Sequence, residues 1–293
     1  MLPLESVPNV SEGRDDVTIG ALAAAFSSRG AQLLDVHSDA DHHRSVFTLV
    51  GDDEALVRSL VAGIAAAQQR IDLRRHDGVH PRVGAADVVP VVPLAAGDMG
   101  RAQAAAVEVA RRVGEELELP VFLYAESGAG RRPAFFRRGG PDELQRRVDA
   151  GELEPDFGPR QLDPRSGAVL VGARRPLVAF NVNLATDDVD VARAIAAAVR
   201  ESSGGLPGVQ ALGLGLARTG RAQVSMNLLD VDGSPLHDVV ARVREEARLR
   251  GVEIAGGELV GLLPGSVVAA AAAPALALDR LASDRLLELR LLD

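Results

Sequence analysis

The repeated order of predicted strands and helices is the feature that most constrains the fold of this 293-residue chain. The spacing of apolar residues predicts the order strand, helix, strand, strand, helix, strand over residues 4–92, with a further helix and strand up to residue 125. The same six-element order returns over residues 177–260. This order is typical of a split βαβ unit, in which helices cover one face of an antiparallel sheet. We therefore predict an α+β fold with two ferredoxin-like α/β subdomains, residues 1–176 and 177–293, each a mainly antiparallel sheet covered by helices.

The boundaries of these elements follow from apolar periodicity and from stop residues such as Gly30. In the first half we expect strands at Leu4–Val10, Ala31–His37, Arg44–Val50, Ala86–Val92 and Pro120–Ala125, and helices at Asp15–Arg29, 53–72 and Asp98–Leu117, the first of them capped by Ser11. In the second half we expect strands at Leu177–Leu184, Val209–Ala217, Gln223–Asp230 and Glu253–Val260, and helices at Asp188–Glu201 and Pro235–Arg250. Between residues 126 and 175 the periodicity weakens, and we expect only a short helix at Asp142–Ala150.

The chain contains neither cysteine nor lysine, which removes whole classes of chemistry. Without cysteine there are no thiolate nucleophiles, cysteine metal ligands or disulfides. All 32 basic residues are arginine, which stays protonated, so Schiff-base and pyridoxal-phosphate chemistry are excluded as well. Proton transfer near neutral pH then falls mainly to histidine, whose unperturbed pKa is about 6.5.

Charge and hydropathy indicate which partners to expect. A formal net charge of −9, one tyrosine and no tryptophan argue against nucleic-acid binding, which needs a basic face and aromatic stacking platforms. The longest apolar run, Val267–Leu278, is interrupted by Pro274 and is well short of the ~20 residues that span a bilayer. The N-terminal segment is acidic and lacks the regions of a signal peptide. We therefore expect a cytoplasmic protein that acts on small molecules, without a membrane or nucleic-acid partner.

Five of the six histidines fall between positions 37 and 80, in two clusters. The first cluster, residues 35–44, lies between two predicted strands, and the second, residues 74–84, lies between a predicted helix and a strand. Loops held by a rigid sheet often carry catalytic side chains, although Asp, Ser and Gly also form ordinary surface turns. Both interpretations stay open for the first cluster, and the second cluster favours a functional site.

Two further patterns of charged residues have competing interpretations. His76 and His80 stand four residues apart, a spacing that suits zinc on a helix, with Asp39, Asp41 or His42 as further ligands. Gly78 and Pro81 disfavour a continuous helix there, so we expect no metal site. The arginine pairs at 131–132 and 137–138 could bind a carboxylate, but nearby acidic residues make a solvated surface the simpler expectation.

Several motifs, in order along the chain, resemble the formiminotransferase domain of the formimidoyltransferase-cyclodeaminase family. They are Val7–Gly13, Arg75–Val88, Pro155–Pro159, Gly167–Arg174, Ala179–Leu184, Gln223–Asp230 and Glu258–Pro264. Ordered motifs spread over most of the chain are far more specific than any one of them. The resemblance implies a stand-alone glutamate formimidoyltransferase with two α/β subdomains, and we expect no cyclodeaminase domain.

The resemblance also implies a reaction and a set of site residues. The family transfers the formimino group from N-formimino-L-glutamate to N5 of tetrahydrofolate, a step of histidine degradation and one-carbon metabolism. Tetrahydrofolate would be a co-substrate, no metal would be needed, and a homodimer is expected. The family's catalytic histidine falls on His80, which is followed by Pro81 and Arg82. Its folate-contacting segment falls on Gly158, Pro159, Arg160, Gln161, Leu162, Asp163, Pro164, Arg165, Ser166 and Gly167, matching the family at both ends and diverging in the middle.

One departure from the family concerns the neighbour of the catalytic histidine. Animal members carry an aspartate at the position where this chain has His37. A carboxylate would raise the pKa of an adjacent imidazole, whereas a second imidazole would not. Asp35 or Asp39 could supply the carboxylate, or His37 and His80 could share the proton transfer; we favour Asp39.

The implied reaction needs a group that moves a proton between two nitrogens. N5 of tetrahydrofolate attacks the amidine carbon, and the glutamate nitrogen leaves well only when it is protonated. We assign both proton transfers to His80. Arg44 and Arg82 are candidates for binding carboxylates of glutamate or folate, because a guanidinium can pair two oxygens at once. A related donor such as N-formylglutamate, and a folate-binding protein without catalysis, are the alternatives.

Overall fold

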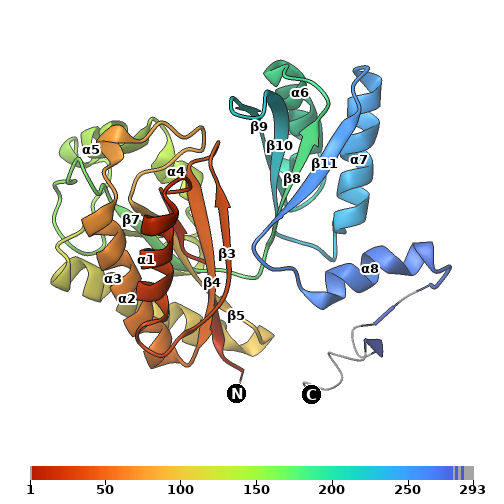
Figure 1. The fold of residues 1–293 in the computed structure, drawn as a ribbon. Helices are drawn as coiled ribbons and strands as arrows, with labels where there is room; N and C mark the ends of the chain where they lie inside the picture. Colours follow the sequence, from red (N-terminus) through yellow and green to blue (C-terminus); the bar gives the residue numbers. More distant parts are fainter. Residues whose placement is uncertain (1, 280, 283–284, 287–293) are drawn as a thin grey trace. The chain divides into compact units, whose positions relative to one another are not determined.

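The computed structural model describes residues 2–279, 281–282 and 285–286. The chain divides into two compact units, Met1–Pro176 and Leu177–Asp293, called the N-terminal and C-terminal units below. Each unit packs helices against its own sheet, so the fold is α+β (Figure 1).

The N-terminal unit is built on a mixed sheet, which has seven strands within the described residues. The strands are β1 (Leu4–Ser6), β2 (Asn9–Val10), β3 (Gln32–Asp39), β4 (Arg44–Gly51), β5 (Ala86–Pro93), β6 (Val121–Leu123) and β7 (Val169–Ala173). Their spatial order is β1-β4-β2-β5-β7-β6, with β3 pairing β4. Pairs among β1 to β5 are antiparallel, whereas β7 is parallel to both β5 and β6.

The parallel part of this sheet differs from the mainly antiparallel arrangement that the sequence predicts. Helix α3 (Met99–Glu116) carries the chain from β5 to β6, and a crossover of this kind places strands parallel. β7 lies between these two strands, and all of its residues are buried. A strand buried on both faces shows a continuous apolar run instead of alternation, so its periodicity did not reveal it.

Helices cover the two faces of the N-terminal sheet to different extents. α1 (Asp16–Ser27), α2 (Asp53–Arg70) and α3 pack on one face, where Leu60 and Val109 join the main apolar core. On the other face, α4 (Pro133–Arg137) and α5 (Gly140–Asp149) form a second core, in which Phe136 and Leu144 contact residues of β5, β6 and β7. The main apolar core therefore lies on the first face of the sheet, whereas the second face carries a smaller core together with polar side chains.

The strand pair β3–β4 brings polar side chains to the second face. Phe47 belongs to the main core, so alternation along β4 turns its neighbour Val46 to the opposite face. In the antiparallel register, His37 lies opposite Val46, and Asp39 lies opposite Arg44. Directly opposed residues share a face of the sheet. His37, Asp39 and Arg44 therefore lie on the face turned away from α1 and α2.

Two local predictions near the N-terminus are wrong. The predicted strand Leu4–Val10 is split into β1 and β2, because Pro8 has no N–H to donate to the ladder. The cap of α1 is the carboxylate of Asp15, whereas the hydroxyl of Ser11 donates to the carbonyl of Gly84 at 2.7 Å. Ser11 thus ties β2 to the chain that precedes β5.

The C-terminal unit holds an antiparallel sheet, four-stranded within the described residues, in the order β11-β8-β10-β9. Its strands are β8 (Val178–Leu184), β9 (Val209–Leu216), β10 (Arg221–Leu228) and β11 (Ile254–Val260), and its helices are α6 (Val189–Val199), α7 (Leu236–Leu249) and α8 (Gly265–Ala275). Ile195 of α6 and Val243 of α7 pack in the core of this unit. Each strand and helix predicted for this half is present at its expected place.

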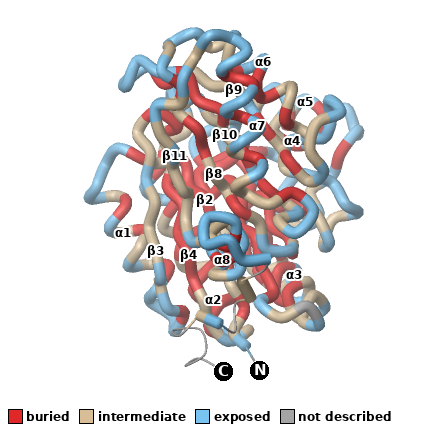
Figure 2. The backbone as a smooth tube through the Cα atoms, turned by 90° about the vertical axis from the view of Figure 1, so that its right-hand side faces the viewer, coloured by how far each residue is buried: buried red, intermediate tan, exposed pale blue. Residues whose placement is uncertain are grey.

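Burial follows the strands and the sheet-facing sides of the helices, whereas the connecting loops are largely exposed (Figure 2). The apolar run Val267–Leu278 forms most of α8, in which Val267, Ala269 and Ala273 are buried. Among the residues that the structure describes, no helix is both long and apolar enough to span a bilayer.

Candidate active site

The two histidine clusters meet in the N-terminal unit. One forms the turn between β3 and β4, and the other forms the loop after the short 3-10 helix Leu73–Arg75. The N–H of Val79 donates to the carbonyl of Asp41 at 3.3 Å. Gly78 lies so close to the turn that a Cβ atom there would clash with the carbonyl oxygen of His42. Glycine is therefore required for the close approach of the two loops.

The rings of His43 and His76 stack at a centroid distance of 4.2 Å and join the two loops. His76 donates from Nε2 to the carbonyl of His43 (2.7 Å) and accepts at Nδ1 from the N–H of Gly78 (3.2 Å), which defines a neutral imidazole. Burial, and then the charge of Arg82, lower the pKa of His76 to about 4. Burial also lowers the pKa of His43, whose Nδ1 accepts from the N–H of Gly13 (3.1 Å). Both rings act as structural, uncharged groups near neutral pH.

The ring of His80 is held as a neutral base. Its Nδ1 atom lies 2.8 Å from the carbonyl of Pro81, which can only accept, so Nδ1 carries the proton. Nη1 of Arg44, which can only donate, lies 2.6 Å from Nε2 and 3.1 Å from Nδ1, so Nε2, the nitrogen without a proton, is the one that accepts from this guanidinium. Burial lowers the pKa of His80 well below its usual value, and the charges of Arg44 and Arg137 lower it further. The ring is therefore able to accept a proton near neutral pH.

Arg44, the first residue of β4, is half-buried, and its Nε atom is shut off from solvent. Burial and the charge of Arg137 lower its pKa to about 9, and the carboxylate of Asp87 opposes this shift only in part. The side chain donates to the imidazole of His80 instead of a carboxylate. A buried cation without a paired anion is unfavourable, and such violations of the packing rules occur mainly at functional sites.

Asp39 and His37 contribute to this site in ways that the sequence does not reveal. Oδ1 of Asp39 accepts the N–H of His42 at 2.7 Å and so closes the turn between β3 and β4. The ring of His42 stacks against that of His80 at a centroid distance of 5.8 Å. His37 lies two residues before Asp39 on the same face of β3. The guanidinium of Arg44 contacts both nitrogens of the His80 ring, at 2.6 Å from Nε2 and 3.1 Å from Nδ1.

Arg82 shapes the loop that carries His80. Its Nη2 atom donates to the carbonyl oxygens of Gly78 and His80, the second at 3.0 Å. Burial lowers its pKa. The arginine two residues after the histidine therefore fixes the backbone that presents the imidazole.

Arg137 was expected on a solvated surface, and this prediction is wrong. The residue ends α4, its side chain is 13% exposed, and its Nη2 atom donates to the buried carboxylate of Asp87. Asp87 also accepts the N–H of Val83 at 2.7 Å, which links the ion pair to the loop of His80. The sequence gives no local signal for this contact, because Asp87 lies 50 residues away along the chain. The other three arginines of the two pairs are exposed, as predicted: Arg131, Arg132 and Arg138.

Comparison with known proteins assigns the chain to a family. The model of the N-terminal subdomain of the formiminotransferase domain matches residues 3–174, and the model of the formiminotransferase domain matches residues 179–281. The glutamate formimidoyltransferase of Streptococcus pyogenes serotype M1 is 40% identical over 267 residues, which cover 89% of each chain. The chain belongs to the formiminotransferase family. The formimidoyltransferase-cyclodeaminase of Rattus norvegicus is 38% identical over 273 residues, which cover 89% of this chain and 50% of the rat protein.

The segment at residues 158–167, which the family resemblance assigns to folate, lies next to the loop of His80. The N–H of Ala85 donates to the carbonyl of Ser166, and the N–H of Leu73 donates to the carbonyl of Arg165, each at 2.8 Å. These backbone bonds tie the segment to the chain on both sides of the histidine loop.

Some residues of this segment are buried and anchor it, whereas others are exposed to solvent. Leu162 and Ser166 are buried, and Leu162 belongs to the core beneath α5. Arg160 is committed to the protein, since it donates to the side chain of Glu154 (2.5 Å) and to the last turns of α5 (2.6 Å). Arg165 is exposed. The buried residues hold the segment in place while its exposed residues face solvent.

The described part of the chain contains no group of three histidine or carboxylate side chains that could hold a metal ion. His76 uses both ring nitrogens in hydrogen bonds in this structure. The segment from His76 to His80 is a loop and not a helix, so the four-residue spacing does not place the two rings on one helical face.

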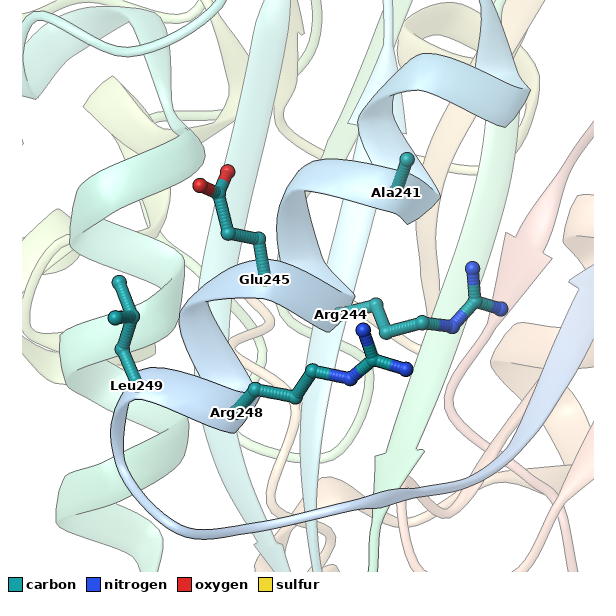
Figure 3. A pocket seen from close by; sticks show the side chains of 5 residues that line it. All are labelled: Ala241, Arg244, Glu245, Arg248 and Leu249. Atoms are coloured by element: carbon teal, nitrogen blue, oxygen red, sulfur yellow. The ribbon is translucent and has the colours of Figure 1, made fainter.

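A hollow of about 420 Å³ lies in the C-terminal unit, along α7 (Figure 3). Its lining residues are Ala241, Arg244, Glu245, Arg248 and Leu249. All of them come from one helix, and none is a histidine. The histidine, arginine and carboxylate side chains that lie close together are found around His80 instead.

Proposed function

We propose that this chain transfers the formimino group of N-formimino-L-glutamate to N5 of tetrahydrofolate. Membership of the formiminotransferase family supports the proposal, as do relatives named glutamate formimidoyltransferase that match over 89% of this chain. The observation that carries the chemistry is the neutral ring of His80, with a lone pair on Nε2. No cysteine or lysine is present to act in its place.

The reaction begins when N5 of tetrahydrofolate attacks the amidine carbon of the donor. A new N–C bond forms, the intermediate is tetrahedral, and Nε2 of His80 takes the proton from N5. The imidazolium then gives this proton to the glutamate nitrogen, and the bond between that nitrogen and the former amidine carbon breaks. His80 ends uncharged again, and the products are 5-formiminotetrahydrofolate and glutamate, which leaves as the free amine and takes its further proton from solvent. General acid–base help of this kind contributes about 10²–10⁴-fold.

Positioning of the two substrates contributes at least as much, because the uncatalysed reaction is bimolecular. We assign folate to residues 158–167, whose backbone is tied to the loop of His80. We assign the donor to the sheet face that carries His37, Asp39 and Arg44. Arg82, which the sequence suggested as a carboxylate ligand, serves by fixing the loop backbone.

We further propose that the two units are the two ferredoxin-like subdomains of the family, with the catalytic histidine in residues 1–176. The strand order β11-β8-β10-β9 of the C-terminal unit supports this interpretation. In the N-terminal unit, β1 to β5 supply the antiparallel part, and β7 and β6 extend the sheet. A homodimer is expected from the family resemblance, and sedimentation of the purified chain measures it.

The decisive experiment mixes the purified protein with N-formimino-L-glutamate and tetrahydrofolate and follows the 5-formimino product. A parallel reaction replaces the donor with N-formyl-L-glutamate. Turnover that depends on the formimino donor supports the proposal. Preferential turnover of the formyl donor assigns the alternative substrate, and folate binding without transfer from either donor overturns the proposal in favour of a binding protein.

A further inference from the structure

Two guanidinium groups and one carboxylate lie beside His80. Arg137 donates to the buried carboxylate of Asp87, while Arg44 donates to a neutral imidazole. The charge of Arg137 lowers the pKa of both Arg44 and His80, so the three groups are close enough to interact. The cluster of Arg44, Arg137 and Asp87 thus has one more positive than negative charge.

Both guanidinium groups also have an unused donor. The Nε atoms of Arg44 and Arg137 are shut off from the surface, and neither has a hydrogen-bond partner among the described residues. Buried N–H groups in folded proteins are nearly always paired, and an unpaired donor on a cation is especially costly. A surplus positive charge next to the part-buried ring of His80 is what a bound anion would offset.

The backbone explains how these groups come together. Asn9 of β2 pairs with Val88 of β5, but the next residue, Val10, pairs with Ala86, so Asp87 is the extra residue of a β-bulge. Bulges often redirect a side chain next to a functional site. The bulge directs Asp87 to Arg137 at the end of α4, and Arg44 lies at the start of β4, a strand that also pairs with β2.

We propose that Arg44 and Arg137 form a carboxylate-binding subsite beside His80, and that it takes the α-carboxylate of the amino-acid donor. This inference rests on the proposed function, because that function makes an N-substituted glutamate the donor. The α-carboxylate is attached to the carbon that bears the reacting nitrogen, whereas the γ-carboxylate lies at the far end of the side chain. Since Arg44 touches the ring that must reach this nitrogen, the α-carboxylate is the one within its range.

The subsite has a consequence for catalysis. In the free protein, Nη1 of Arg44 donates to Nε2 of His80, the atom that must accept the proton of folate. A carboxylate is a stronger acceptor for a guanidinium than a neutral imidazole is. A bound donor therefore takes over the hydrogen bond of Arg44 and leaves Nε2 of His80 open to the incoming N5–H. Donor binding therefore makes Nε2 of His80 available to accept a proton.

Calorimetric titration with L-glutamate, the amino-acid product, tests the subsite without requiring turnover. We expect Arg137→Gln to weaken glutamate binding by about 10- to 100-fold, the loss typical of one charge-assisted hydrogen bond. Arg244→Gln, on α7 in the C-terminal unit (Figure 3), is the matched control and should bind glutamate as the wild type does. Unchanged glutamate affinity in the folded Arg137→Gln protein overturns the proposal.

Two further arms keep the test decisive. Because Arg137→Gln leaves Asp87 buried without its partner, the double variant Asp87→Asn/Arg137→Gln removes both charges, and thermal unfolding confirms that it is folded. On the wild-type protein, isoglutamine, which has an α-amide, should bind much more weakly than glutamine, which has a γ-amide. The reverse order overturns the assignment of the α-carboxylate even if both variants fail to fold.

The same measurements separate this inference from the proposed function. If the wild-type protein binds glutamate through Arg137 but transfers no formimino group, the subsite is supported and the proposed function is wrong. If the wild-type protein transfers the group, and Arg137→Gln changes neither the glutamate affinity nor KM, the proposed function is supported and the subsite is wrong.

Discussion

Nη1 of Arg44 lies 2.6 Å from Nε2 of His80 and 3.1 Å from Nδ1, and the charge of Arg44 adds to burial in lowering the pKa of the ring. A carboxylate in the same place would favour the imidazolium form, whereas a cation favours the neutral form. The ring is therefore uncharged near neutral pH. An uncharged ring is the form that the proposed reaction requires at its start, when the proton of N5 leaves folate.

Replacing His80 with alanine should lower kcat by about 10²–10⁴-fold, because the variant loses the group that moves the proton between the two nitrogens. The affinity for tetrahydrofolate should stay close to that of the wild type, since residues 158–167 are held by backbone bonds that the substitution does not remove. Steady-state turnover and calorimetric folate binding measure the two effects. His237→Ala, in the first turn of α7, is the control. Near-normal kcat in the His80 variant would contradict the assignment.

The pH dependence of kcat/KM should report the charge of Arg44. In the wild type we expect activity to persist below pH 6.5, because the pKa of His80 lies well below its usual value. Arg44→Met removes a positive charge next to the ring, which favours the protonated form, so the acidic limb should move to higher pH. Arg58→Met, on the exposed side of α2, should leave the limb in place. If the acidic limb of kcat/KM does not move in Arg44→Met, the charge of Arg44 does not set the pKa of His80.

Most helices and strands could be predicted from the sequence because their apolar periodicity is local. Leu56, Leu60 and Ile64 recur at helical spacing and do form the buried side of α2. The mixed sheet could not be predicted in the same way, since β7 is buried on both faces and has no alternation. Its place between β5 and β6 depends on tertiary packing, which a periodicity does not encode.

The candidate site was predictable only in part, for a related reason. Motif order identifies His80, but the partner of its ring is 36 residues away in sequence. Asp39 and Arg44 lie opposite each other at the same end of the β3–β4 hairpin, so either could have reached the ring. The turn decides between them: His43 adopts a positive φ of 50°, and Asp39 is used to close the turn by accepting the N–H of His42.

Gly167→Ala should weaken both folding and folate binding. Gly167 has a φ of +67°, and a Cβ atom there would clash with the carbonyl oxygen of Val83, just after the loop of His80. Backbone strain alone costs roughly 1–3 kcal/mol. We expect a lower free energy of unfolding together with a higher KM for tetrahydrofolate, measured by denaturant titration and steady-state kinetics. Gly20→Ala, in the open middle of α1, should instead stabilise by about 0.5–1 kcal/mol and leave KM unchanged.

The stack of His43 and His76 should make the N-terminal unit less stable as the pH falls. The pKa of His76 is about 4 in the folded protein and near 6.5 when unfolded, so the unfolded state binds more protons between these values. The full contribution of His76 to the free energy of unfolding is present above pH 6.5, and it falls by about 2 kcal/mol at pH 5.

His76→Gln keeps a donor toward the carbonyl of His43 but does not titrate, so the stability of this variant should depend less on pH. The chain's one tyrosine, Tyr124, is buried in this unit and reports its unfolding in denaturant. Wild-type and His76→Gln proteins that lose stability equally between pH 7 and pH 5 would show that this ring is not held neutral by the fold.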